Sequence, residues 1–263
     1  MDAPATTSAG EAAVVCEGIG KTWGAANGQI EALRGFSCRI KPGEIVAILG
    51  PSGCGKSTLL EIIAGLEEPT VGNVRVNGRA VSSPPDDCSL IYQDNSLFPW
   101  LTAAQNVAFP LRLRSAGRSD SLEKATDMLS RVGLSGFADK FPHELSGGMA
   151  QRVAIARALL KGTRVLLMDE PFGSLDSQTR SEMHSLLLQV WGLSKPTIVF
   201  VTHQVDEAIL LSDRICVMTP RPGHISQIVE VPLARPRSDL RPDFLPLKAT
   251  ITAAITTTNN GSH

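Results

Sequence analysis

A glycine-rich run followed by a lysine and two hydroxyl residues has the spacing of a phosphate-binding loop. Residues 50–58 read GPSGCGKST, which fits the pattern G-x-x-x-x-G-K-[ST]. The glycines let successive backbone N–H groups turn toward one anion, and a helix expected over Ser57–Ala64 adds partial positive charge. We expect Lys56 to reach the β- and γ-phosphates of a nucleotide and the Ser57 hydroxyl to bind Mg²⁺. An ordinary glycine-rich turn would not explain the whole pattern. The predicted loop residues are Gly50, Pro51, Ser52, Gly53, Cys54, Gly55, Lys56, Ser57 and Thr58.

An acidic pair directly follows a second apolar run. Residues 165–168 read VLLM, which predicts a buried strand, and Asp169 and Glu170 come next. Ligands of α/β proteins bind at the carboxyl ends of strands, so both carboxylates are expected at the phosphate site. Asp169 would hold Mg²⁺, which leaves Glu170 to orient or deprotonate an attacking water. Alone this signal is weak, because acids often cap strand ends, but the phosphate loop upstream strengthens it.

Short strands and helices alternate on either side of a helical stretch. Residues 14–81 read as strands and turns, with Asn77-Gly78 as a hairpin signal, whereas residues 101–160 are mainly helical in pattern. The alternation predicts an α/β fold with a mostly parallel sheet and an inserted helical lobe. The strands expected in that sheet are Ile45–Leu49, Ser89–Tyr92, Val165–Met168, Thr197–Val201 and Ile215–Met218. The helices expected are Ser57–Ala64, Leu122–Val132, Met149–Leu160, Ser177–Leu193 and Asp206–Leu211.

Composition excludes several classes of protein. The 263 residues carry a formal net charge of −1 and only 5% aromatic residues, which argues against a nucleic-acid-binding protein. No run approaches the roughly 20 apolar residues of a membrane helix. Five widely spaced cysteines fit neither a disulfide framework nor a zinc site, which favours a reducing, intracellular setting. We expect residues 1–12 to form a disordered tail without a secretory signal, and residues 235–263 to form a loosely packed C-terminal tail.

Residues 145–152, LSGGMAQR, resemble the signature sequence of the ATPase subunit of ATP-binding cassette transporters. The resemblance covers about residues 14–231, and Met149 stands where the family usually has Gln. Ser146, Gly147 and Gly148 are expected to open a helix, which makes a second anion site. In the family this site caps the γ-phosphate of ATP that the partner chain holds. The resemblance therefore implies a homodimer that encloses ATP and Mg²⁺ at its interface.

The resemblance also assigns four single residues. Gln93 follows the Ser89–Tyr92 strand and matches a glutamine that senses Mg²⁺ and the attacking water, while His203 matches a histidine that contacts the γ-phosphate. Asp176 lies in the loop that crosses the dimer interface in the family. Trp23 matches the aromatic that stacks on adenine. Gln93 or His203 alone would more often be a surface or cap residue.

The family further implies a RecA-like core with an antiparallel N-terminal β subdomain. The implied cassette spans residues 13–234, with the core at 13–92 and 161–234 and the helical subdomain at 93–160. Residues 97–102 (LFPWLT) and 218–223 (MTPRPG) are similar to the nitrate, sulfonate and taurine importers. In those proteins the region Gln93–Trp100 meets the coupling helix of a permease. Phe98 and Trp100 suit either that contact or packing of the lobe.

The expected function is ATP hydrolysis that drives import of a small solute through a separate permease, at the cytoplasmic face of the membrane. A substrate-binding protein would take part indirectly. Alternatives are the ATPase of another small-molecule transporter, a cassette protein that does not act in transport, and a kinase with a phosphate-binding loop. The signature sequence and His203 disfavour the kinase.

Overall fold

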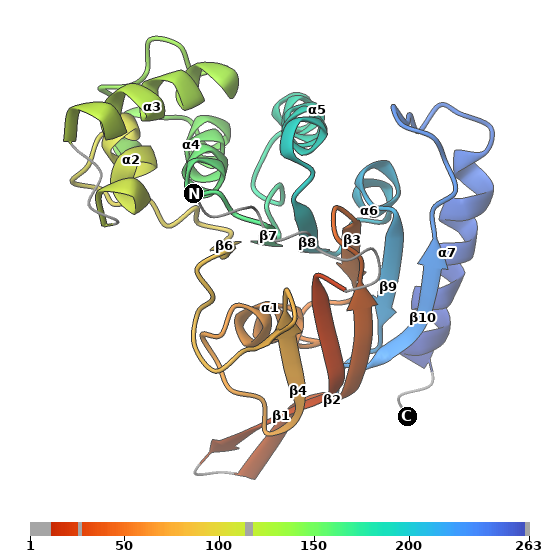
Figure 1. Cartoon of the computed structure of the whole chain (residues 1–263). Helices are drawn as coiled ribbons and strands as arrows, with labels where there is room; N and C mark the ends of the chain where they lie inside the picture. The colour runs from red at the N-terminus through yellow and green to blue at the C-terminus, as the bar shows by residue number, and fades with distance from the viewer. Residues whose placement is uncertain (1–11, 26–27, 114–117, 261–263) are drawn as a thin grey trace.

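A six-stranded sheet organises the molecule (Figure 1). The computed structural model describes residues 12–25, 28–113 and 118–260. The strand order is β10-β9-β3-β8-β7-β6, and all neighbours pair in parallel except β9 and β10. The mostly parallel α/β fold predicted from the sequence is therefore confirmed. The strands are β3 (Ile45–Leu49), β6 (Cys88–Ile91), β7 (Val165–Asp169), β8 (Thr197–Thr202), β9 (Arg214–Met218) and β10 (Ile225–Glu230).

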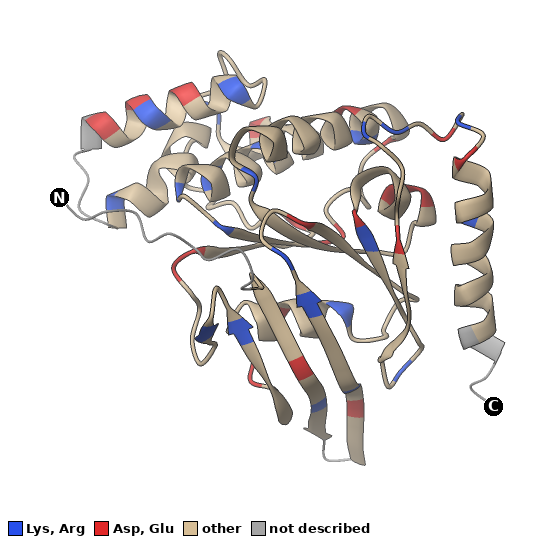
Figure 2. Ribbon diagram, turned by 45° about the vertical axis from the view of Figure 1, so that its right-hand side comes forward, with Lys and Arg blue, Asp and Glu red and all other residues tan. Residues whose placement is uncertain are grey.

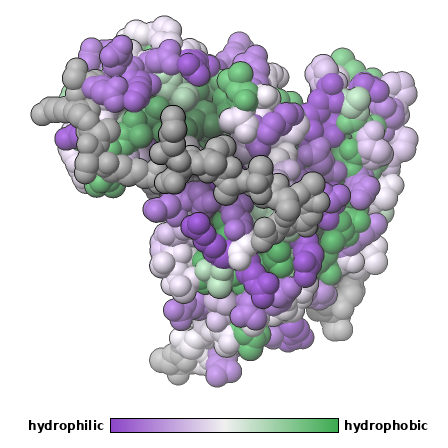
Figure 3. All heavy atoms as spheres, in the orientation of Figure 1, coloured by the Kyte–Doolittle hydropathy of each residue, from purple (hydrophilic) through white to green (hydrophobic). Residues whose placement is uncertain are grey.

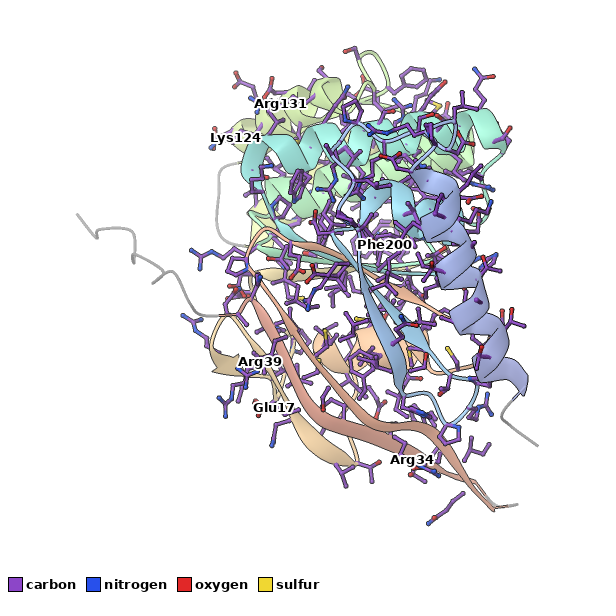
Figure 4. The ribbon with its side chains drawn as sticks, turned by 90° about the vertical axis from the view of Figure 1, so that its right-hand side faces the viewer. Glu17, Arg34, Arg39, Lys124, Arg131 and Phe200 are labelled. Carbon is purple, nitrogen blue, oxygen red and sulfur yellow. The ribbon has the colours of Figure 1, made fainter. Side chains whose placement is uncertain are left out.

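A four-stranded antiparallel sheet of order β2-β1-β4-β5 lies beneath the core sheet in Figure 1. Asn77 and Gly78 adopt φ values of 48° and 77° between β4 and β5, as the hairpin signal predicted. Glu17 and Arg39 form a 2.9 Å ion pair between β1 and β2, and Figure 4 shows both on this sheet. The strands are β1 (Val14–Ala25), β2 (Gly28–Ile40), β4 (Val71–Val76) and β5 (Arg79–Ala80).

Side chains that alternate along the core strands feed two hydrophobic cores. Val199 and Val201 of β8 pack toward the antiparallel sheet and α1 (Lys56–Ile63), whereas Ile198 and Phe200 pack toward the helices on the other face. Phe200 is fully buried and lies near the middle of the molecule in Figure 4. Because both faces are covered, the strands read as continuous apolar runs. The helices on that other face include α5 (Ser177–Ser194) and α6 (Val205–Leu211).

The helical lobe lies to one side of the core sheet (Figure 1). It holds α2 (Ala103–Leu113), α3 (Arg118–Arg131), a 3₁₀ turn (Pro142–Glu144) and α4 (Gly147–Leu160), all between residues 93 and 160. The predicted helical stretch at residues 101–160 contains α2, for which no separate helix was predicted, and this helix contains Pro110. The amide of the buried Asn106 in this helix donates to the Phe98, Leu101 and Thr102 carbonyl oxygens and so holds the 97–102 loop in place.

The expectation of a loosely packed C-terminal tail was wrong. Residues 244–260 form helix α7, which packs beside α6, β9 and β10 (Figure 1). Phe244 and Ile251 of this helix are 1% and 0% exposed. Before it, the Arg237 guanidinium donates to carbonyl oxygens that include those of Ile209 and Ser212, at and beyond the end of α6. The arginines of this segment therefore help to order the chain. The predicted tail at residues 1–12 lies outside the described residues except for Ala12.

We expect Phe244→Ala to lower the free energy of unfolding by about 3 kcal/mol, because it empties a fully buried aromatic site. Urea unfolding followed by circular dichroism would measure the change. Leu245→Ala, at a neighbouring side chain that is 64% exposed, is the matched control and should change stability by less than about 0.5 kcal/mol. Equal stability of both variants would show that α7 does not contribute to the hydrophobic core.

Candidate nucleotide site

The phosphate loop connects β3 to α1 and is shaped by glycine. Gly55 precedes the helix with φ 97°, a conformation that side chains rarely adopt. A Cβ atom there would lie 2.8 Å from the carbonyl oxygen of Ala32 in β2. Glycine at this position therefore lets the loop close over the helix N-terminus while it touches the antiparallel sheet.

The Lys56 side chain is held over the phosphate loop by hydrogen bonds to the backbone of that loop. Its Nζ atom donates to the carbonyl oxygens of Gly50 and Pro51 at 2.9 Å each, and the residue is only 5% exposed. The same nitrogen lies 3.9 Å from Oε1 of Glu170. The ammonium group is thus placed between the loop and the carboxylate that follows β7.

A cavity of about 390 Å³ opens above this loop. Its volume falls within the range typical of small-molecule sites. Trp23 is 38% exposed at the cavity, and the Lys21 ammonium lies 4.4 Å from the centre of its ring. The cavity thus combines an aromatic surface with a cationic phosphate loop. The lining residues are Trp23, Ile30, Ala32, Ser52, Gly53, Gly55, Lys56, Ser57, Thr58, Glu170 and Arg221.

The two carboxylates at the end of β7 differ in their surroundings. Burial raises the pKa of Asp169, and a hydrogen bond from the Ser57 hydroxyl opposes that shift. Glu170 has φ 41°, which is a strained conformation for a residue with a side chain, and its Oε2 atom lies 3.1 Å from Nδ1 of His203. The hydroxyl and carboxylate oxygens of Ser57 and Asp169 are donors that suit a hard cation such as Mg²⁺.

Gln93 also lies near Glu170. A Cβ atom built on Gly173 would be 3.7 Å from Oε2 of Glu170 and 3.8 Å from Nε2 of Gln93, so Gly173 leaves space for both. The structure thus brings together residues from the ends of β6, β7 and β8 with the phosphate loop. Of the other loop residues predicted to bind nucleotide, Gly50 and Cys54 are buried beneath the loop and Pro51 is half-buried. Burial raises the pKa of the Cys54 thiol.

Four predicted residues lie at the starts of two other helices, away from the phosphate loop, and do not line the cavity. Ser146 caps α4, and its hydroxyl accepts a hydrogen bond from the backbone N–H of Met149 at 3.3 Å. Gly147 and Gly148 follow it in the first turn of that helix. Asp176 caps α5 and accepts hydrogen bonds from the backbone of Gln178 and Thr179, and its bonds to Thr179 lower its pKa. The predicted helix start at Ser146 is present, but within this chain it forms a site apart from the phosphate loop.

Three residues that line the cavity were not predicted from the sequence. Ile30 and Ala32 are ordinary strand residues, and nothing in their types marks them as neighbours of the phosphate loop. Arg221 lies in the MTPRPG segment, which carried only a family resemblance. The run Pro220-Arg221-Pro222-Gly223 could have indicated an ordered turn that positions the arginine side chain.

Comparison with known proteins identifies the family. Residues 33–173 match the family model described as ABC transporter. The chain belongs to the ABC transporter family. An uncharacterized ABC transporter ATP-binding protein of Methanocaldococcus jannaschii is 46% identical over 217 residues, which cover 82% of this chain and 81% of that protein. The aliphatic sulfonates import ATP-binding protein SsuB of Bacillus subtilis is 45% identical over 212 residues, which cover 81% of this chain and 82% of SsuB.

A solved structure agrees with this assignment. The dimeric structure of an ATP-binding cassette in a post-hydrolysis state, bound to ADP and Pi, is 33% identical with a TM-score of 0.75. The match covers 84% of this chain and all of that one. The chain is therefore an ATPase of the ABC transporter family, and its activity is ATP binding and hydrolysis.

Proposed function

We propose that this ABC ATPase powers import of a small solute of the sulfonate, taurine or nitrate kind through a separate permease. The proposal takes its support from relatives named for aliphatic sulfonate import at 41–45% identity. No helix in the described residues has the length and apolar character needed to cross a membrane.

At the proposed ATP site, Lys56 and the N–H groups of the loop residues hold the phosphates. Trp23 stacks on adenine. The oxygen atoms of Ser57, Asp169 and Gln93 would bind Mg²⁺. The ion would neutralise part of the negative charge of the phosphates. Mg²⁺ takes much of its coordination from water and phosphate, so a site with one carboxylate fits it. Removal of divalent cations is therefore expected to stop hydrolysis.

Glu170 is the proposed general base. Its carboxylate accepts the proton of the attacking water, and His203 and Lys56, on either side of it, stabilise the negative charge that develops on the γ-phosphate. The strained backbone at Glu170 holds the carboxylate where the end of β7 meets the end of β8. Each step assigned here rests on a side chain that the fold brings to the same edge of the sheet.

The proposed active form is a homodimer. Ser146, Gly147 and Gly148 present a capped helix N-terminus, yet they do not line the cavity of their own chain. A helix N-terminus binds anions. We infer that this surface, with Asp176, completes the ATP site of a second copy, and the dimeric cassette structure among its relatives supports this arrangement.

An apolar groove between the core and the lobe is the single observation that carries the permease contact. The groove has a volume of about 490 Å³ and is lined by residues that include Leu66, Phe98, Phe109, Leu113 and Arg157. Trp100, at 70% exposure, does not line the groove but lies beside it, with its ring centre 5.6 Å from that of Phe98. The Phe98 ring also packs on Phe109 at 4.6 Å between centres. Hydrophobic residues also gather on the α2–α4 lobe in the view of Figure 3. Phe98 thus packs the lobe, while Trp100 is available as an aromatic anchor.

A nucleic-acid partner has less support. Figure 2 shows acidic and basic residues interspersed along α3, where Lys124 pairs with Asp120 and Arg131 pairs with Asp127. Such pairing of opposite charges does not make the basic face that phosphate backbones require. A membrane partner matches the apolar groove better.

Reconstitution tests the proposed function. A candidate permease would be placed in lipid vesicles with this chain and with a substrate-binding protein. ATP should then drive uptake of labelled taurine, an alkanesulfonate or nitrate, and uptake should stop with Glu170→Gln. Co-purification with ribosomes instead of the permease would contradict the proposal.

We expect Trp100→Ala to weaken binding to the permease by at least about tenfold, because an exposed aromatic anchor is removed from the docking surface. The amount of this chain retained on immobilised permease, titrated by concentration, measures the effect. Leu193→Ala removes another exposed apolar side chain, on α5 and in a different element from the 97–102 loop that borders the groove, and should bind as the wild type does. Equal retention of both variants would show that Trp100 does not anchor the permease.

A further inference from the structure

The turn between β9 and β10 lies directly against the phosphate loop. Gly223 in this turn accepts a hydrogen bond from Arg34 N–H and donates one to the Ala32 carbonyl oxygen of β2. A Cβ atom at Gly223 would lie 1.9 Å from the Cys54 carbonyl oxygen, so only glycine fits between the turn and the loop. The turn, β2 and the phosphate loop are therefore in mutual backbone contact.

Hydrogen bonds within the turn give it one shape. The Thr219 N–H donates to the His224 carbonyl oxygen at 3.0 Å, and the His224 N–H donates to the Thr219 hydroxyl at 3.1 Å. Two prolines, Pro220 and Pro222, flank Arg221 and restrict its backbone. The arginine between them is thus presented from a closed, braced turn, which lowers the entropy lost when its side chain binds a ligand.

Arg221 uses only part of its donor capacity within the protein. Its Nε and Nη2 atoms each donate to the Gly53 carbonyl oxygen at 3.2 Å. A guanidinium carries five N–H donors, so three remain beyond these two contacts. In the described part of the chain no carboxylate forms an ion pair with Arg221, although its side chain is exposed and lines the nucleotide cavity.

The position of Gly53 indicates which part of the nucleotide Arg221 meets. The backbone of a phosphate loop cradles the α- and β-phosphates, and its lysine reaches toward the γ-phosphate. Arg221 is bonded to that backbone at Gly53, whereas Glu170 lies beside Lys56. Lys56 and Arg221 are the two cationic side chains among the described residues that line this cavity.

We propose that Arg221 is a nucleotide-binding residue, which contacts the α- and β-phosphates while its bonds to Gly53 hold the phosphate loop in place. The contact forms when ATP or ADP binds and does not involve the attacking water, so it contributes chiefly to binding of the nucleotide. Arg221 therefore sets nucleotide affinity and not the rate of the chemical step. This inference rests on the ATPase activity of the family and does not depend on the permease or the solute.

Calorimetric titration of the purified chain with ATP, ADP and adenosine tests the proposal. Arg221→Ala should weaken ATP and ADP by the same factor of about 10 to 100, the range expected for lost charge-assisted hydrogen bonds, and leave adenosine unaffected. In steady-state hydrolysis, KM should rise by a similar factor while kcat changes by less than about twofold. Arg221→Lys keeps the charge without the two-pronged contact and should recover at least half of the lost affinity on a logarithmic scale.

Arg75→Ala is the matched control, since it removes an exposed arginine from β4, away from the cavity, and should bind both nucleotides as the wild type does. Thermal unfolding without nucleotide checks that each variant is folded. Wild-type affinity of Arg221→Ala would overturn the proposal. A loss of affinity for ATP but not for ADP would place the contact at the γ-phosphate. Equal losses of affinity in Arg221→Lys and Arg221→Ala would show that Arg221 only positions Gly53. Either result would refute direct binding of the α- and β-phosphates.

Discussion

Glu170→Gln is expected to reduce kcat for ATP hydrolysis by about 10²- to 10⁴-fold, the range that a general base contributes. The amide has the shape of the carboxylate and can keep the 3.1 Å contact with His203, so the fold and the cavity should be preserved. It cannot accept a proton from water. Removing its charge beside Lys56 also takes away a repulsion toward phosphate, so ATP affinity should be kept or increased.

Size-exclusion chromatography with ATP would then show a second species, since a dimer that forms on ATP binding cannot reopen without hydrolysis. Glu230→Gln is the matched control, with the same chemical change at an exposed residue of β10, and it should hydrolyse ATP at the wild-type rate. Wild-type turnover by Glu170→Gln would remove this residue from the mechanism and leave Asp169 and Gln93 as the groups to examine. Loss of ATP binding would point to a structural role instead.

The parts of the site that the sequence predicted are those encoded locally. Residues 50–58 specify a loop by their own glycines, and the loop lies between a strand and a helix that also show in the sequence. Asp169 and Glu170 could be placed because a parallel strand delivers the residues after it to the same edge of the sheet as its neighbours. Resemblance to a family supplied Gln93 and His203, whose types alone say little.

The parts that the sequence did not predict depend on contacts between distant segments. Arg221 meets Gly53 only because β9 pairs with β3 and the following turn fits beneath the phosphate loop. Helix α7 has a weak apolar pattern, since its central residues are mainly Ala and Thr, and two buried residues hold it in place. Helix α2 lies in the stretch predicted to be mainly helical, but its bounds could not be predicted, because Pro110 is unfavourable inside a helix and tertiary packing stabilises it. In each case the structure is stabilised by tertiary contacts, which produce no periodic pattern of apolar residues in the sequence.

Ser146→Arg is expected to lower hydrolysis by at least about 100-fold while ATP binding to the monomer changes by less than about twofold. Ser146 is exposed and does not line the cavity of its own chain, so the arginine leaves the phosphate loop untouched. The lost helix cap costs about 1 kcal/mol, which is too little to unfold the lobe. If the α4 N-terminus completes the site of a second copy, a long cationic side chain there blocks the approach of the two chains.

The measurement that decides this is ATP binding by calorimetry beside hydrolysis and dimer formation on the same samples. Ser130→Arg makes the same substitution at an exposed residue of α3 in the same lobe, and it should behave as the wild type in all three. Loss of ATP binding by the Ser146 variant would place this serine in its own chain's site. Normal turnover would mean that hydrolysis needs no second copy at this surface. In one chain the cavity lies apart from the helix cap at Ser146, whereas in the proposed dimer both contact the same nucleotide. The proposed dimer therefore predicts that Ser146→Arg impairs hydrolysis and dimer formation but leaves ATP binding to the monomer intact.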